Sequence, residues 1–301
     1  MFCSMALFGC MAAPVKGQTL PLSFAFPEKS HAEVTERVLR GGQEMKFAYD
    51  LDIQKTAGGG MSVAHSKARV VEFQGKAVTE SEQTPMIFMA LTVAGKTSVL
   101  EVNAQGGFEA VANVKDIVSA FEKVFERADV PDPTNEQAKK QMLEVIRSAK
   151  GQSMMGVAAA AAWRNCVEGW IGFDVKPGAT ESDLIDSETI PGMSVRCERT
   201  LTHLGKASSD PLLWHLRLQS RIADDSYGKK LVDHLRSVNP EAAARLNPDD
   251  IQRSQPVTTV EGHIDPATLR PHWIKVQIKV ETGATSNTDE FEYEFKWLPK
   301  E

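Results

Sequence analysis

The sequence predicts an α+β protein in which a curved, mostly antiparallel β-sheet packs against central helices. Strand-like alternation of apolar and polar residues covers residues 33–112, helical spacing covers 113–168, and alternation returns from residue 194. Separate blocks of strands and helices favour α+β over alternating α/β architecture. The strands form either a half-barrel or two related β halves, and a remote duplication of the two β blocks is a hypothesis without a matching residue run.

The closing meander, Val257 to Leu298, gives the clearest pattern. Ile274, Val276, Ile278 and Val280 alternate with Lys and Gln, and then Phe291, Tyr293, Phe295 and Trp297 alternate with Glu and Lys. Period two predicts antiparallel strands with one apolar and one polar face. On the polar face, lysines of one strand are expected opposite glutamates of the next. Trp273 is the exception, because it falls on the polar parity.

The remaining elements follow from turn residues and periodicity. Strands are predicted at 33–40, 43–55, 61–74, 86–93, 98–102 and 108–112, with Gly41-Gly42 and Gly58-Gly59-Gly60 as hairpin turns. Asn113 is the expected N-cap of a first helix, Thr134 begins a second, and Gln152 to Glu168 form a third, buried one. After a polar connector at 176–186 we expect strands at 194–204 and 212–222, a helix at 227–238 and a short turn at 240–246.

These elements suggest four segments. Residues 1–19 are an export or lipoprotein signal, 20–128 an N-terminal β block with a closing helix, 129–186 a helical connector, and 187–301 a C-terminal β block with an inserted helix. Residues 1–13 are apolar and rich in small residues, which is typical of an export signal, although no Lys or Arg precedes them. The start codon therefore lies upstream or the signal is atypical.

Within that signal, Leu7-Phe8-Gly9-Cys10 resembles the lipobox of bacterial lipoproteins. Three outcomes stay open: lipidation of Cys10, cleavage near Ala12 or Ala13, and retention of the segment. The apolar run is shorter than the ~20 residues that span a bilayer. We therefore expect a bacterial exported protein, periplasmic or associated with the outer membrane, with membrane contact only through a lipid anchor.

Two cysteines, Cys166 and Cys197, remain beyond the signal. In an oxidising compartment they predict a disulfide, and two separate buried thiols are the alternative. No CxxC and no His at ligand spacing accompanies them, so no metal site and no cofactor is expected. A net charge of -6 argues against a general nucleic-acid binder.

Apparent catalytic motifs lack their structural context. Residues 90–97 differ by one residue from a P-loop, but a strand follows them where a helix is needed, which favours a hairpin turn. Residues 151–156 have one residue too many for a serine-nucleophile elbow. Asp50 and Asp52 are expected to be solvated charges, and the seven histidines show no metal-binding spacing, although His263 and His272 flank one hairpin turn. No enzyme is predicted.

The residues 258–276, from Thr-Thr-Val-Glu-Gly-His through Asp-Pro to Trp-Ile-Lys-Val, resemble a recurring pattern of uncharacterised bacterial exported domains. Asp265-Pro266 begins the turn there through Asx chemistry and a preset φ. The order of signal, strands, central helices and closing meander is similar in outline to lipoprotein-carrier half-barrels of the bacterial envelope. That resemblance implies an apolar cavity and transfers no functional residue.

We therefore expect a non-enzymatic envelope protein that offers an apolar cavity or surface to a lipid, an acyl chain or a protein partner. The alternatives are a structural or interaction module of the envelope without a ligand and, with no motif in its favour, an exported hydrolase. Apart from Trp273, the tryptophans are expected in the core, and the alternative is that they line a ligand cavity. The candidate cavity residues are those of the meander's apolar side and two helical methionines: Ile274, Val276, Ile278, Phe291, Tyr293, Phe295, Met154 and Met155.

Overall fold

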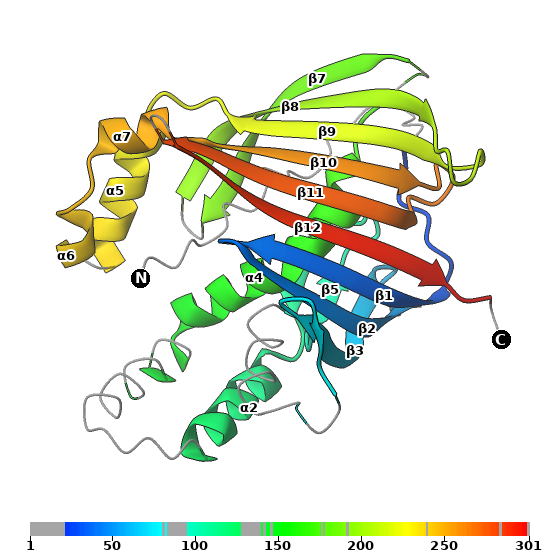
Figure 1. The fold of residues 1–301 in the computed structure, drawn as a ribbon, viewed down its shortest axis with the longest axis horizontal. Coiled ribbons are helices and arrows are strands. Elements are labelled where there is room, and N and C mark those ends of the chain that lie inside the picture. Colours follow the sequence, from blue (N-terminus) through cyan, green and yellow to red (C-terminus); the bar gives the residue numbers. More distant parts are fainter. Residues whose placement is uncertain are drawn as a thin grey trace. The chain divides into compact units, whose positions relative to one another are not determined.

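A computed structural model describes residues 22–79, 82, 95–127, 140, 143–144, 147–174, 176, 178–190, 193–238, 240–282 and 285–299. Strands and helices occur in separate blocks and the paired strands are antiparallel (Figure 1), so the predicted α+β class is confirmed. The predicted signal, the strand at 86–93 and most of the second helix lie outside the described residues. The chain divides into two compact units.

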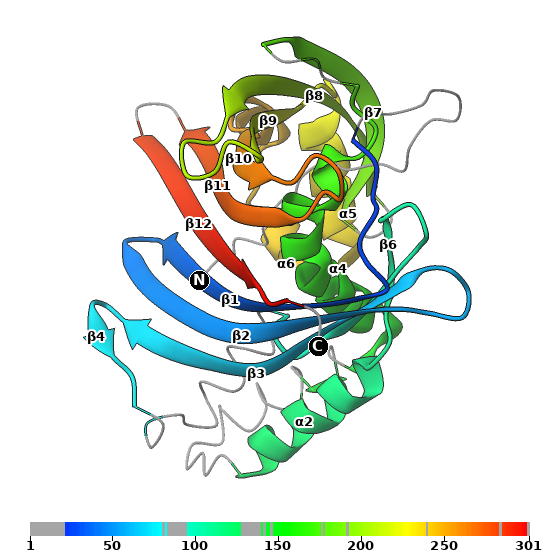
Figure 2. The same ribbon diagram turned by 90° about the vertical axis from the view of Figure 1, so that its right-hand side faces the viewer.

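Unit 2 contains the segments Pro27–Glu36 and Met45–Trp163 together with residues 295–299. Its strands run in the hydrogen-bonded order β6-β5-β3-β2-β1. Figure 2 shows β1, β2 and β3 side by side, with β4 beside β3. Gly41, Gly42 and Gly59 adopt positive φ, which confirms the two predicted hairpin turns. The strand bounds are β1 Lys29–Arg40, β2 Gln43–Lys55, β3 Met61–Phe73, β4 Lys76–Ala77, β5 Val99–Val102 and β6 Phe108–Val111.

Two helices follow these strands, α2 (Val114–Arg127) and α4 (Ala149–Cys166). Both were predicted, but the role assigned to Asn113 was wrong in one respect. Its backbone carbonyl accepts the first helical hydrogen bonds, whereas its side chain binds the Val99 N–H (2.8 Å) and the Thr97 carbonyl oxygen (2.9 Å). Asn113 therefore fastens the start of α2 to the turn that precedes β5.

Unit 1 contains residues 22–26 and the segments Arg37–Glu44 and Arg164–Glu294. Its strands follow the order β12-β11-β10-β9-β8-β7. A short 3-10 helix, η2 (Glu168–Trp170), follows α4, and three further helices are α5 (Tyr227–Val238), α6 (Pro240–Ala243) and α7 (Pro248–Arg253). The strands are β7 Thr180–Ile190, β8 Met193–Lys206, β9 Trp214–Ile222, β10 Pro256–Ile264, β11 Pro271–Thr282 and β12 Thr285–Trp297.

Strand β7 corrects the predicted polar connector at 176–186. All of its described pairing is with β8, so it is the last strand of its run. An edge strand is covered by the rest of the protein on one face at most. Charged side chains are therefore tolerated on both of its faces. The acidic residues Glu181, Asp183 and Asp186 interrupt the apolar alternation that is typical of a strand, so the sequence pattern did not predict β7.

The polar face of the meander differs in detail from the expected ladder. Lys275 lies opposite Glu292 in register, but its ammonium pairs diagonally with Glu290 at 3.2 Å. Lys279 lies opposite Thr288 and pairs with Glu281 on its own strand at 2.6 Å. Opposite charges do gather on this face, yet the strand register does not place every lysine against a glutamate.

Candidate functional site

The apolar face of unit 1 carries most of the predicted cavity residues. The register of β11 with β12 places Ile274 opposite Tyr293, and Val276 opposite Phe291, on the same face as Ile278. The alternation continues through β8, β9 and β10, whose buried residues on that face include Leu201, Leu216, Leu218, Val260 and Ile264. Ile274 and Val276 are 0% exposed, so the centre of this face is packed core.

Trp170 packs on the centre of this face, against Gly262 of β10, which has no side chain. A Cβ on Gly262 would lie 2.6 Å from Ile274 Cδ1 and 3.2 Å from Trp170 Cζ2. Glycine in a strand interior therefore permits the close approach of the indole ring. Trp170 is fully buried and its Nε1 donates to the Cys166 carbonyl oxygen at 2.9 Å, which fixes the ring over the sheet.

The same face becomes more exposed toward the β11–β12 hairpin. Phe291 of β12 lies opposite the fully buried Val276 of β11, so the two side chains share a face. Ile278 and then Val280 follow Val276 on the same face of β11. Phe291 and Val280 are both partly exposed. An aromatic side chain left partly in water beside a packed core is an apolar surface available for contact. This end of the face is the candidate binding surface, defined by Val280 and Phe291, with the buried Ile278 beneath it.

The other predicted cavity residues lie elsewhere in the chain. Tyr293 is buried in unit 1, whereas Phe295 falls in unit 2 and stacks with Trp297 at a centroid distance of 6.1 Å. Met155 packs in unit 2 against the cluster around Ile117 on α2. The side chain of Met154 lies outside the described residues. A single site containing all eight residues stays a prediction.

Sequence reasoning missed a polar row on the apolar face of unit 1. Cross-strand register aligns Asp183 of β7 with Arg199 of β8, then Ser220 of β9, then Thr258 of β10. Arg199, Ser220 and Thr258 are at most 5% exposed. The parity of Arg199 with buried Val195, Cys197 and Leu201 was a usable indication that this guanidinium points inward.

A second buried charge pair lies in unit 2 and explains the P-loop-like motif. Lys96 forms an ion pair with Glu36 of β1, and both side chains are 4% exposed. The Lys96 ammonium also lies 5.0 Å from the Tyr49 ring centroid. Gly95 has φ +75° and sits against Ala159 of α4, so residues 95–97 are a turn before β5, as predicted. The lysine stabilises the turn and is not presented to a phosphate.

Histidines gather on the polar face without forming a metal centre among the described residues. His263 lies between His215 and Trp273, at ring centroid distances of 5.0 and 4.9 Å. His263 meets the His215 ring edge-on and the Trp273 ring at a tilt of 44°, on the two adjacent strands. Trp273 confirms its polar parity by donating to Glu292 at 2.8 Å.

The expectation that Asp50 and Asp52 are solvated charges is incomplete, because Asp50 forms an ion pair and Asp52 forms side-chain hydrogen bonds. Asp50 binds Lys67 at 2.7 Å, and Asp52 binds His31 at 2.6 Å and accepts from the Ser66 hydroxyl at 3.2 Å. Each carboxylate thus has a protein partner on β3 or β1. This arrangement is a surface charge network of unit 2.

The predicted Cys166–Cys197 disulfide is wrong, because Cys166 carries a buried thiol. Cys166 ends α4, whereas Cys197 packs in the middle of β8 with Met193, Val195, Ile222 and Tyr227. The proposed lipidation residue Cys10 lies outside the described residues.

Comparison with known proteins gives distant likenesses in fold. No family model matches the chain, and no curated protein matches it. Among solved structures, one titled for lipid–protein interactions in lipovitellin has a TM-score of 0.41 and 5% identity, covering 91% of this chain and 25% of its own. A LolA superfamily protein from Nitrosomonas europaea has a TM-score of 0.26 and 12% identity, covering 92% and 89%. This chain thus spans a quarter of the lipovitellin chain, and likenesses this loose carry no functional argument.

Proposed function

We propose that this is a non-enzymatic exported envelope protein that presents an apolar surface to a lipid or acyl chain. The observation that carries the proposal is the partly exposed end of the apolar face in unit 1, where Phe291 and Val280 continue the pattern of the buried core. Contact with an acyl chain would remove this surface from water, at roughly 25 cal/mol per Å² of apolar area.

The location of the protein is part of the proposal. Export rests on the apolar start of the sequence, with Cys10 lipidation or cleavage near Ala12 or Ala13 as the two processed forms. Among the described helices, none is long and apolar enough to cross a bilayer.

The test is mass spectrometry of lipids extracted from protein purified under native conditions, with a variant pair. Phe291→Asp puts a charge on the binding surface and should abolish lipid recovery. Phe73→Asp is the matched control, because Phe73 is a 42% exposed phenylalanine of unit 2. Equal lipid recovery from both variants would contradict the assignment of the surface.

The alternative function is a structural or interaction module without a ligand, and the observation in its favour is the edge strand β7. Leu184 on β7 is 63% exposed, and among the described strands β7 pairs with β8 alone. Such an edge can accept a strand from a protein partner. Protein that carries no lipid, and whose melting temperature is unmoved by added acyl chains, would favour this alternative.

A further inference from the structure

The polar row of Asp183, Arg199, Ser220 and Thr258 leaves one buried donor group unused. Arg199 is 4% exposed, and its Nη1 has no hydrogen-bond partner within the described part of the chain. Buried polar groups in native structures are almost always hydrogen bonded to protein or ordered water, so Nη1 is a position for a water molecule or a ligand oxygen. The row lies in unit 1 on the same face as the candidate binding surface.

The geometry around the guanidinium defines which edge is available. Arg199 donates from Nε (3.0 Å) and Nη2 to the two carboxylate oxygens of Asp183, a bidentate pair. The ring of Phe173 lies 4.7 Å from the guanidinium carbon, so it covers one side of the plane. A guanidinium has five N–H donors, and this arrangement uses two of them and leaves both of Nη1 and the second of Nη2.

Charge decides what kind of acceptor fits. Asp183 already balances the positive charge of Arg199, so a carboxylate or phosphate would add an uncompensated negative charge in a buried site. An uncharged oxygen adds none and still accepts the Nη1 hydrogen bond. The buried hydroxyls of Ser220 and Thr258, next along the row and 5% exposed, add uncharged polar groups to the same stretch of the face.

We propose that this row is a subsite for the carbonyl oxygen of a neutral acyl ester, with the acyl chain directed toward the candidate binding surface of unit 1. The inference rests on the proposed function and narrows its ligand class to esters of fatty acids, as distinct from free fatty acids and hydrocarbons.

The experiment compares two ligands that differ only in the carbonyl group, 1-decanoylglycerol and its ether analogue 1-decylglycerol, by isothermal titration calorimetry on the full chain. Wild-type protein should bind the ester about tenfold more tightly than the ether, the value of one charge-assisted hydrogen bond. Decanoate should bind more weakly than the ester. Equal affinities for ester and ether, or tighter binding of decanoate, would overturn the subsite.

Variants test whether the polar row causes the preference for the ester over the ether. Asp183→Asn with Arg199→Gln removes the ion pair as a unit and should bring the ester-to-ether ratio to about one. Ser220→Ala with Thr258→Val keeps the ion pair and should lower the ratio severalfold, which decides the matter if the first variant does not fold. Arg221→Gln is the control, because Arg221 lies on the opposite face of β9 in an exposed pair with Glu198 and should leave the ratio unchanged.

The outcomes separate the two proposals. Binding of both ligands with equal affinity leaves the lipid-binding function intact and rejects the carbonyl subsite, with water then filling the place beside Nη1. Binding of neither ligand contradicts the proposed function, and the subsite falls with it. A ratio that persists in both row variants places carbonyl recognition elsewhere and rejects this assignment.

Discussion

At the scale of single residues, the fold keeps His65 uncharged. His65 lies in β3 with its Nδ1 donating to the Ser98 carbonyl oxygen at 3.0 Å and its ring 5.4 Å from that of Tyr49. Loss of hydration, and then the positive charge of Lys96, lower the pKa of His65 from 6.5 to about 4, although the hydrogen bond to Ser98 opposes the shift. The neighbouring Lys96–Glu36 pair is therefore coupled to the protonation of this ring.

A pH dependence of stability follows from His65. Between pH 6.5 and pH 4 the unfolded chain binds a proton at His65 that the folded chain does not, so this residue lowers the free energy of unfolding as the pH falls through that window, by roughly 1–3 kcal/mol. His65→Gln keeps a donor for Ser98 and should flatten the slope. Urea denaturation at several pH values measures it, and an unchanged slope in the variant would exclude His65 as its source.

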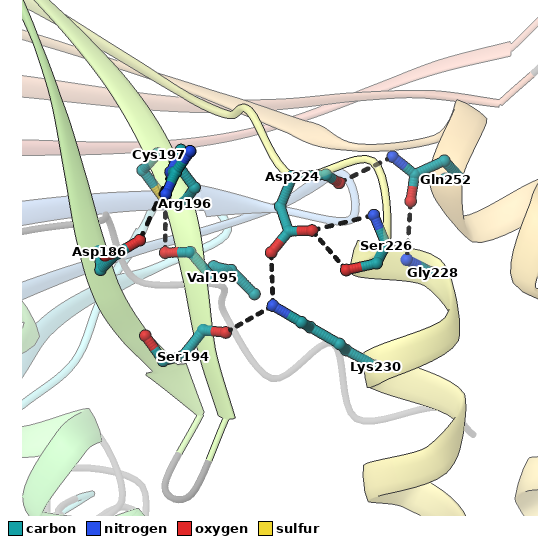
Figure 3. Close-up of polar contacts among 10 residues, drawn as sticks. All are labelled: Asp186, Ser194, Val195, Arg196, Cys197, Asp224, Ser226, Gly228, Lys230 and Gln252. Atoms are coloured by element: carbon teal, nitrogen blue, oxygen red, sulfur yellow. Dashed lines mark hydrogen bonds and ion pairs between the residues drawn. The ribbon is translucent and has the colours of Figure 1, made fainter.

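At the scale of elements, one glutamine joins helices α5 and α7. Gln252 of α7 donates to the Asp224 carbonyl oxygen at 3.0 Å and accepts from the Gly228 N–H of α5 at 2.8 Å (Figure 3). Lys230 of α5 binds Asp224 at 2.7 Å and the Ser194 carbonyl oxygen of β8 at 3.2 Å. Burial alone would raise the pKa of Asp224, but the hydrogen bonds and charge of Lys230 and Ser226 lower it by more. The net pKa lies well below the ordinary value, so the carboxylate stays charged.

Removing that glutamine should loosen the helical pair. Gln252→Ala leaves the Gly228 N–H and the Asp224 carbonyl group without their partner, which should cost about 1–2 kcal/mol and speed amide exchange in α5. Gln219→Ala on the exposed face of β9 is the control and should change stability by less than about 0.5 kcal/mol. Equal exchange rates in α5 for both variants would show that other contacts hold the pair.

At the scale of the whole molecule, the sequence predicted elements better than their assembly. Alternation identified the meander because each of its strands has one buried face, and helical spacing identified α2 and α4. It failed at β7, whose polar residues serve an edge, and at α7, which has six residues and no buried side chain. The candidate surface was predicted in part, since Phe291 lies on it, whereas Ile274 and Val276 are core.

The rest depends on long-range register that no local pattern contains. By residue type alone, Arg199 is expected to be exposed, and only the pairing of its strand shows that it lies among buried side chains. Asp183 comes next to Arg199 only because β7 pairs with β8. Likewise, residues 37–44 group with Arg164–Glu294, far along the chain. Such grouping comes from strand pairing, and the duplication of the two β blocks stays a hypothesis.

The accessibility of the Cys166 thiol tests whether the core of unit 1 is closed. Cys166 is 3% exposed, and its carbonyl oxygen holds Trp170 over Gly262, so its thiol becomes reachable only when unit 1 opens. We expect iodoacetamide to leave Cys166 unmodified in native, unreduced protein and to modify it in guanidinium without reductant, as read by peptide mass spectrometry. Prior reduction should not change the extent of modification. A denatured, unreduced sample in which the Cys166 peptide remains joined to the Cys197 peptide would restore the disulfide that the sequence predicted.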